Sequence, residues 1–282
     1  MHIERKLELR ITNPSTLASF RWALKLLRKK RGYRTSYDSW DALEVISSVD
    51  NVTTKNVLYQ LLRKLYQIAE WDWNDNIVKR PPKIDFENVK TPVLDKDLII
   101  QTINNANTLS PLLKTIWALS TTWGMRRNEI LMILENPDWV MTDEDPPRLK
   151  IKAQKGGITR LSLIPEEIFD VIELIKKHDM SISKSRISAL FHHIIYRTTG
   201  KLMPEKGFGY HSVRRALINY LLPPYTTLSD AEVFRFMRWS DTAAGRVSIL
   251  YRYASTAKEE SWFDLDRKVY SQHPWLKYWG GK

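Results

Sequence analysis

Apolar residues recur every three or four positions through much of the N-terminal part of the chain, which is the spacing of helices with one buried face. Asn13 followed by Pro14 is a helix-start signal, because asparagine caps free backbone N–H groups and proline fits the first helical turn. Residues 1–12 alternate loosely and favour a short strand or an arm. The pattern predicts three helices here, over 17–31, 40–47 (begun by Asp38 or Ser39) and 52–69.

A break in this pattern separates two domains. Pro81-Pro82 interrupts the chain, and the segment 79–92 combines three prolines with charged residues and few large apolar ones, a composition typical of a linker. We therefore predict a helical domain over 1–80, a linker over 81–92 and a second domain over 93–282.

The second domain combines helices with one hairpin. Two alternating runs, 148–154 and 158–165, flank Gly156-Gly157, and this arrangement predicts a β-hairpin with Lys155 at its tip. The predicted fold class is therefore mainly α with a small antiparallel β-sheet (α+β). Helical spacing predicts helices over 95–104, 112–120, 166–177, 185–197, 228–237 and 249–262.

Two short stretches place arginine where an anion would be held. Gly124 ends the helix predicted over 112–120 and the next helix starts at once, so Arg126 falls in a first helical turn near free backbone N–H groups. His211 and Arg214 stand three residues apart at the start of another predicted helix, and at that spacing their side chains share one face. An imidazole beside a guanidinium is a good grip for a phosphate.

Composition points to a polyanionic partner. Among the 282 residues, 44 Lys+Arg stand against 32 Asp+Glu, for a formal net charge of +12. A chain this basic favours nucleic acid as its partner. The stretch from Lys25 to Arg34 contains no acidic residue, so the first long helix presents a basic face that includes Arg21, Lys25, Arg28 and Lys29.

Other classes of function are excluded or disfavoured. The chain has no cysteine, which excludes disulfides, zinc–thiolate sites, Fe–S clusters and a cysteine nucleophile. No apolar run approaches the roughly 20 residues of a membrane span, and the N-terminus lacks a signal-peptide pattern. We therefore expect an intracellular protein with no membrane association.

Taken in order, these stretches resemble the catalytic domain of the tyrosine recombinases, the phage-type integrases. That family shows Gly-x-Arg-x-x-Glu, a lysine on a hairpin, His-x-x-Arg, a histidine or tryptophan after a tight turn, and a nucleophilic tyrosine. The small helical N-terminal domain and the proline-bearing linker are similar as well, so the resemblance spans nearly the whole chain. The matching stretches are Gly124–Glu129, Lys155, His211–Arg214, Trp239-Ser240-Asp241 and Arg252-Tyr253-Ala254.

The resemblance implies a role for each matched residue. Arg126 and Arg214 would clamp the non-bridging oxygens of a DNA phosphate. His211 and Trp239 would add N–H donors to the same oxygens, and preorganised donors of this kind stabilise a developing oxyanion by roughly 3–4 kcal/mol each. Lys155 would be the general acid that protonates the leaving 5′-hydroxyl.

The nucleophile implied by the family is a tyrosine. Arg252-Tyr253-Ala254 matches the common Arg-Tyr-Ala ending, which favours Tyr253, whereas Tyr251 needs a smaller insertion and is the alternative. Residues two apart on a helix point about 200° apart, so only one of them can face the site. Two nearby guanidiniums should favour the phenolate by lowering a phenol pKa that is intrinsically near 10.

Some residues depart from the family pattern or stand beside it. Met237-Arg238-Trp239 replaces a Leu-Gly-His turn; tryptophan is a known alternative to that histidine, whereas arginine in place of glycine is less usual. The spacings on either side of Trp239 are also longer than usual. Glu129 is expected to orient an arginine rather than to act as a base. Two lysines that could exchange roles with Lys155 are Lys150 and Lys152.

The resemblance implies a site-specific recombinase that cleaves and rejoins double-stranded DNA through a 3′-phosphotyrosyl intermediate, as a homo-oligomer that forms a tetramer in the synapse, without cofactor or metal. Its location would be the cytoplasm (nucleoid) or the host cell of a mobile element. Type IB topoisomerases and telomere resolvases share this chemistry, and a catalytically degenerate DNA-binding protein is a further alternative. The residues expected to contact DNA outside the active site are Arg21, Lys25, Arg28, Lys29, Arg127 and Arg215.

Overall fold

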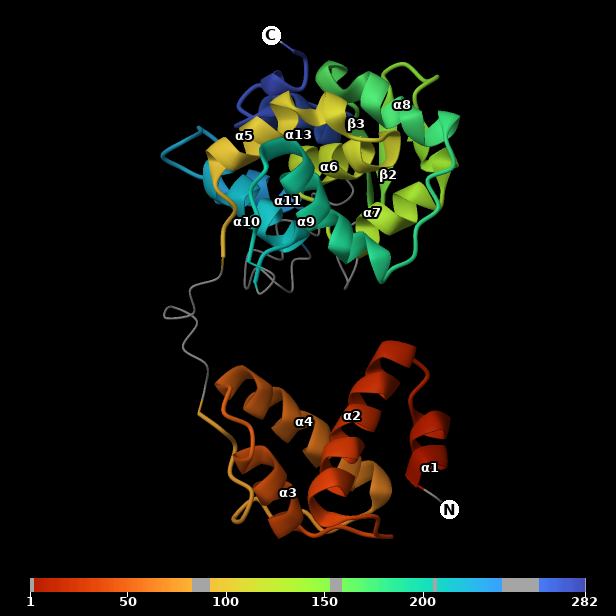
Figure 1. Ribbon diagram of the computed structural model, residues 1–282, viewed down its shortest axis with the longest axis vertical. Coiled ribbons are helices and arrows are strands. Elements are labelled where there is room, and N and C mark those ends of the chain that lie inside the picture. Colours follow the sequence, from red (N-terminus) through yellow and green to blue (C-terminus); the bar gives the residue numbers. More distant parts are fainter. Residues whose placement is uncertain (1–2, 83–91, 153–158, 205–206, 240–258, 282) are drawn as a thin grey trace. The chain divides into compact units, whose positions relative to one another are not determined.

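The chain divides into two compact units, 1–90 and 91–282 (Figure 1). Both are built mainly of helices, and the second contains one three-stranded antiparallel sheet. The predicted fold class is therefore confirmed. None of the helices in the described part of the chain is long and apolar enough to cross a membrane. The computed structural model describes residues 3–82, 92–152, 159–204, 207–239 and 259–281, with side chains in the last range from 262 onwards.

The first unit is a bundle of helices around one apolar core. The three helices predicted from the sequence are present, and an additional one precedes them. Each long helix packs on the others, and the shared core includes Leu24, Leu58 and Tyr66, all at most 1% exposed. The helices are α1 (Ile3–Arg10), α2 (Pro14–Arg31), α3 (Ser39–Ser47) and α4 (Val52–Ala69).

The prediction of a strand or an arm over 1–12 is wrong, because this segment contains the helix α1. Ile3, Leu7 and Ile11 lie four residues apart and all pack against the core, whereas Leu9 is 68% exposed. The apolar spacing of four is therefore the relevant period, and the alternation that includes Leu9 is coincidental. An acidic side chain of this helix, Glu8, pairs with α2, which further fixes α1 on the bundle.

Capping residues define the starts of these helices. The Asn13 side chain accepts hydrogen bonds from two backbone N–H groups in the first turn of α2, as the sequence indicated. At α3 the cap is Asp38 rather than Ser39, and Asp41 completes a reciprocal capping box with it. Asn51 caps α4 through the N–H of Thr54.

The second unit is larger and has its own apolar core. Its strands are β1 (Val140–Met141), β2 (Arg148–Ile151) and β3 (Arg160–Leu163), in the order β1-β2-β3. The register pairs Lys150 with Leu161, so the predicted hairpin is confirmed in its strands. The helices are α5 (Lys96–Asn104), α6 (Pro111–Trp123), α7 (Arg127–Leu134), α8 (Phe169–Lys177), α9 (Arg186–Thr199), α10 (Tyr210–Leu221), α11 (Asp230–Phe236) and α13 (Glu259–Tyr270).

Helix α6 is the centre of the second unit. From Thr115 to Trp123 every residue is buried, and α7, α8, α9 and α10 all contact this helix (Figure 1). Gly124 ends it with a left-handed backbone (φ 55°), and a Cβ there would lie 2.6 Å from the Met237 side chain. The left-handed backbone favours glycine at this position, and a larger residue would also displace the end of the Met237 side chain. The tight turn brings the chain directly into α7, and this places Arg126 beside the end of α6.

The C-terminal segment packs onto the same unit. Trp275 is fully buried and its indole N–H donates to the Thr121 carbonyl (3.0 Å), while Trp279 donates to the Thr121 hydroxyl (3.3 Å). The tail therefore contributes to the core of its own chain. The preceding helix α13 continues to Tyr270, beyond the predicted end at Trp262; the part of that prediction over 249–258 lies outside the described residues.

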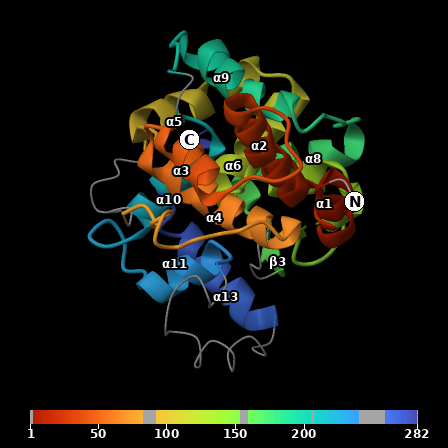
Figure 2. The same ribbon diagram turned by 90° about the horizontal axis from the view of Figure 1, so that it is seen from below.

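A buried ion pair joins α13 to the hairpin. Asp266 is 0% exposed and accepts hydrogen bonds from the Arg160 guanidinium, the Ser162 hydroxyl (2.9 Å) and the Leu163 backbone N–H (2.9 Å). Helix α13 lies along β3 and beside α11, as both views show (Figures 1 and 2). This pair therefore fixes the helix that follows the candidate nucleophiles against the strand that follows Lys155.

We expect Asp266→Asn to lower the free energy of unfolding by about 3–5 kcal/mol, because it leaves the Arg160 charge buried without a counter-ion. The measurement is chemical denaturation of the full chain. Asp264→Asn is the matched control on the same helix, since Asp264 and its partner Arg267 are both exposed and such pairs contribute little. Equal midpoints for the two variants would contradict this assignment.

Candidate active site

Arg126 is positioned by the carboxylate of Glu129. Its guanidinium donates to Oε1 of Glu129 (2.8 Å) and its backbone N–H donates to Oε2 (2.8 Å). Glu129 lies in the first turn of α7 and is buried, whereas the Arg126 side chain is 19% exposed. Arg126 is the residue immediately before the first turn, so its predicted place inside that turn is wrong by one position. The expectation that Glu129 orients an arginine is confirmed.

Arg214 joins the ends of two helices. It lies on α10, is 4% exposed, and donates from Nη1 to the Gly124 carbonyl (2.7 Å) and from Nη2 to the Met237 carbonyl. These carbonyls follow α6 and α11, where helical backbone partners run out and cations are favoured. A guanidinium has five N–H donors and Arg214 uses two of them in these hydrogen bonds, so further N–H groups remain for a ligand.

Arg238 is a further member of the cluster that sequence reasoning did not assign. Its side chain is 0% exposed, and Nη2 donates to Oε2 of Glu129 (3.1 Å). The residue has φ 57°, a left-handed backbone that favours glycine. The only signal in the sequence was the departure from the Leu-Gly-His pattern, which marks a turn but does not say where an arginine side chain would go.

Trp239 lies beside Arg214, and His211 is on the same helix as Arg214. The Trp239 ring lies 5.7 Å from the Arg214 guanidinium and 4.8 Å from the Phe234 ring, and it is partly buried. His211 lies three residues before Arg214 on α10, and its side chain is exposed. The structure thus brings together Arg126, Arg214 and Trp239, with His211 on the same helix as Arg214. The predicted general acid Lys155 and both candidate nucleophiles, Tyr251 and Tyr253, lie outside the described residues.

The electrostatics of the cluster suit an anion. Burial alone would raise the pKa of Glu129, but the charges of Arg238, Arg214 and Arg126, with the hydrogen bond from the Arg126 backbone, lower it to about 2. Burial lowers the pKa of Arg214, and the charges of Arg238 and Arg126 add to this effect. Three guanidiniums face one carboxylate, so the cluster keeps a positive excess. It can therefore offset the charge of a phosphodiester and of its more highly charged transition state.

The basic face predicted on α2 is partly neutralised. Arg21 pairs with Glu8 and Arg28 pairs with Glu4, both on α1. These pairs could not be predicted from the sequence because residues 1–12 were not expected to form a helix. The exposed lysines Lys25 and Lys29 form no ion pair with any residue that the structure describes.

The two arginines predicted to contact DNA from the second unit lie beside the cluster residues in sequence. Arg127 is exposed and donates to the Ser188 hydroxyl (2.9 Å). Arg215 is partly buried and donates to the Pro92 carbonyl (3.0 Å), so part of its guanidinium is already engaged. Among the alternatives to Lys155, the Lys150 ammonium lies 5.5 Å from the centre of the Trp139 ring.

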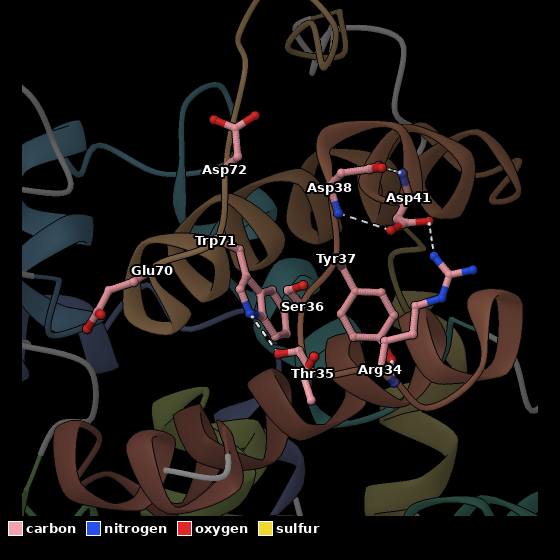
Figure 3. A pocket seen from close by; sticks show the side chains of 9 residues that line it. All are labelled: Arg34, Thr35, Ser36, Tyr37, Asp38, Asp41, Glu70, Trp71 and Asp72. Atoms are coloured by element: carbon pink, nitrogen blue, oxygen red, sulfur yellow. Dashed lines mark hydrogen bonds and ion pairs between the residues drawn. The ribbon is translucent and has the colours of Figure 1, made fainter.

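A hollow in the first unit does not fit a phosphate. Its volume is about 670 Å³. Figure 3 shows its lining side chains, which come from the α2–α3 connection and from the end of α4. Trp71 closes one side by donating to the Thr35 carbonyl (3.2 Å), and Asp41 there is paired with Arg31. Four carboxylates against one arginine make the lining acidic, so we do not place the active site here. The lining residues are Arg34, Thr35, Ser36, Tyr37, Asp38, Asp41, Glu70, Trp71 and Asp72.

No group of three or more histidine, aspartate or glutamate side chains that could hold a metal ion occurs among the residues with defined positions. The prediction that the chain uses no metal and no cofactor stays a prediction.

Several solved structures have a fold similar to that of this chain. A lambda integrase dimer bound to a COC′ core site is 15% identical to this chain, with 86% of this chain and 93% of the integrase chain covered and a TM-score of 0.59. A second lambda integrase dimer, on the same kind of site, gives 15% identity, coverage of 90% and 76%, and a TM-score of 0.62.

A third structure, the XerH site-specific recombinase bound to a difH substrate, is 14% identical over 86% of this chain and 78% of its own, with a TM-score of 0.51. No protein-family model and no curated protein sequence matches the chain. At these identities the comparison establishes the fold of the chain.

Proposed function

We propose that this chain, which has the tyrosine-recombinase fold, is a site-specific DNA recombinase that cleaves and rejoins strands through a 3′-phosphotyrosyl intermediate. The observation that carries the proposal is that Arg126 and Arg214 come together beside the buried carboxylate of Glu129, with the Trp239 ring next to Arg214. Guanidiniums held at fixed positions side by side are what a phosphate that gains charge during attack requires.

In the proposed reaction a tyrosine, Tyr253 or alternatively Tyr251, loses its phenolic proton to solvent, and the resulting phenolate oxygen attacks the scissile phosphorus. The bond from phosphorus to the 5′-oxygen breaks, and that oxygen takes a proton from Lys155 to leave as a hydroxyl. Arg126 and Arg214 stabilise the charge on the non-bridging oxygens. The new phosphotyrosyl ester conserves the bond energy, so a 5′-hydroxyl can reverse the step on the same or another strand without ATP.

We further propose that the partner is duplex DNA and that the chain acts as a homo-oligomer, with a tetramer in the synapse. The lambda integrase neighbours are dimers bound to a core site, and the XerH neighbour is bound to its DNA substrate. The formal charge of +12 supports such a partner. The reaction would take place in the cytoplasm, at the nucleoid, or in the host cell of a mobile element.

A covalent adduct tests the proposal. The full chain would be incubated with a supercoiled plasmid that carries the DNA flanking its gene, in the presence of a metal chelator and without ATP. We expect a protein–DNA species that survives denaturation, disappears on protease treatment and leaves a free 5′-hydroxyl at the nick. DNA binding without any such species would reject strand transfer and leave a DNA-binding protein.

The exposed lysines of α2 supply a prediction about affinity. Replacing Lys25 and Lys29 together by alanine should weaken binding to duplex DNA and make the slope of log K against log salt shallower by about 2, because each phosphate contact releases about 0.9 counter-ions. Fluorescence anisotropy at several salt concentrations measures this slope. The control is Lys176→Ala with Lys177→Ala, whose charges are paired with Asp143 and Glu173.

The slope should stay unchanged in this control. A slope that changes equally in both double variants would show that α2 is not the contact surface.

A further inference from the structure

Arg238 joins the same two helix ends as Arg214. Its Nη2 donates to the Trp123 carbonyl (3.2 Å) and its Nη1 donates to the Phe236 carbonyl (3.2 Å). Each carbonyl lies one residue before the carbonyl that Arg214 uses in that segment. Two guanidiniums therefore bridge neighbouring positions at the ends of α6 and α11, where carbonyls otherwise lack partners.

The backbone at this position adds an independent observation. Arg238 has φ 57°, which an L-residue with a side chain adopts only at an energetic cost, and its side chain is nevertheless completely buried. A buried arginine in such a conformation persists only when its contacts over-determine it. The contact that distinguishes it from Arg214 is the one with Glu129, whose Oε2 also accepts the Arg126 backbone N–H.

We infer that Arg238 is a positioning residue of the proposed active site: it holds the Glu129 carboxylate against Arg126 and thereby sets the orientation of the Arg126 guanidinium toward the scissile phosphate. Because Arg238 is 0% exposed, it acts through Glu129 and does not itself touch DNA. The inference rests on the proposed function, since the phosphate is part of it.

The charges around Glu129 give the inference a pH signature. The charges of Arg126, Arg214 and Arg238 all lower the pKa of Glu129 against the effect of burial. Burial and the charge of Arg160 lower the pKa of Arg238. Removing Arg238 should therefore raise the pKa of Glu129. Since that pKa is depressed in the folded chain, the stabilisation from Glu129 is lost as pH falls through the folded value. In the variant this loss should occur at a higher pH than in the wild type.

The experiment is a double-mutant cycle of Arg238→Met and Glu129→Gln in the full chain. We expect Arg238→Met to slow adduct formation by about 100-fold, the usual cost of misplacing a catalytic group, while DNA affinity changes little. The acid limb of the rate profile should move to higher pH. Glu129→Gln should remove that limb, and the double variant should be no slower than Glu129→Gln alone.

Arg235→Met is the matched control, since Arg235 is on the same segment and lies 4.5 Å from the Trp262 ring, outside the cluster. It should keep the wild-type pH profile. Three results would overturn the inference. The rate losses of the two substitutions could be additive, the pH–rate profile of Arg238→Met could match that of the control, or Arg238→Met could lose DNA affinity in parallel with rate. If Arg238→Met fails to fold, Arg238→Lys takes its place in the cycle and should keep part of the rate.

Thermal unfolding of the same proteins separates this inference from the proposed function. If the wild type forms no adduct, the proposed function fails. The positioning of Glu129 by Arg238 is then judged from the unfolding midpoints. The effects of the two substitutions on the midpoint should be non-additive, and in Arg238→Met the loss of stability at low pH should begin at a higher pH than in the wild type. Unfolding without coupling and without that shift would overturn the role of Arg238.

Discussion

Tyr253→Phe should abolish the covalent protein–DNA adduct while DNA affinity stays at the wild-type level. The substitution removes only the phenolic oxygen, which is the proposed nucleophile, and keeps the aromatic ring. With Tyr253 as the nucleophile, no second group takes over the formation of the ester, so the loss should be complete within detection. The measurement is a denaturing gel with a nicked suicide substrate, combined with anisotropy on the intact duplex.

Tyr251→Phe is the matched control for this result. It removes the same oxygen from a tyrosine two positions away, and the two cannot face the site together if the segment is helical. We expect this variant to form the adduct at the wild-type rate. If Tyr251→Phe loses the adduct and Tyr253→Phe retains it, the nucleophile is Tyr251 and our choice is wrong.

Arg126→Ala should reduce the rate of adduct formation by roughly 10²–10³-fold, the loss seen when one oxyanion donor is removed. Its side chain is partly exposed and bonds only to Glu129 among the residues that the structure describes, so the fold should tolerate the change. Single-turnover kinetics on the suicide substrate measure the rate. An equal fall in DNA affinity would indicate that Arg126 only anchors DNA.

Arg214→Ala should behave differently, because this guanidinium also joins two helix ends. Its loss leaves the carbonyls of Gly124 and Met237 without donors in a buried setting. We therefore expect both a loss of adduct formation and a lower midpoint of chemical denaturation, whereas Arg126→Ala should lose only the former. Wild-type stability in Arg214→Ala would contradict the bridging role.

Most of the fold could be predicted because local signals agree with the tertiary structure. Asn13 with Pro14 and the alternating runs around the Gly-Gly turn each specify an element without help from distant residues. The helix α1 could not be assigned in the same way. Its eight residues are too few for strong periodicity, and its position depends on burial of Leu7 and on ion pairs with α2.

The sequence motifs predicted several residues of the candidate site, but not all of the side chains that hold them in place. Residue order indicated Arg126, Arg214 and Trp239, and Glu129 was expected to orient an arginine, although which arginine was not specified. Arg238 was missed because its role depends on a left-handed backbone and on carbonyls at the ends of two helices. A linear pattern records that glycine is absent, but not which distant oxygen atoms a buried guanidinium will find.

The hydrogen bond between Arg238 and the Glu129 carboxylate, which also holds Arg126, links positions 129 and 238, which lie 109 residues apart. Replacing Arg238 by glycine would remove the backbone strain at that turn, but Oε2 of Glu129 would lose the guanidinium that donates to it. Replacing Glu129 by a neutral residue would leave the buried Arg238 guanidinium without its counter-ion. Neither change is neutral alone, so among descendants of this sequence the two positions should be inherited or replaced as a pair.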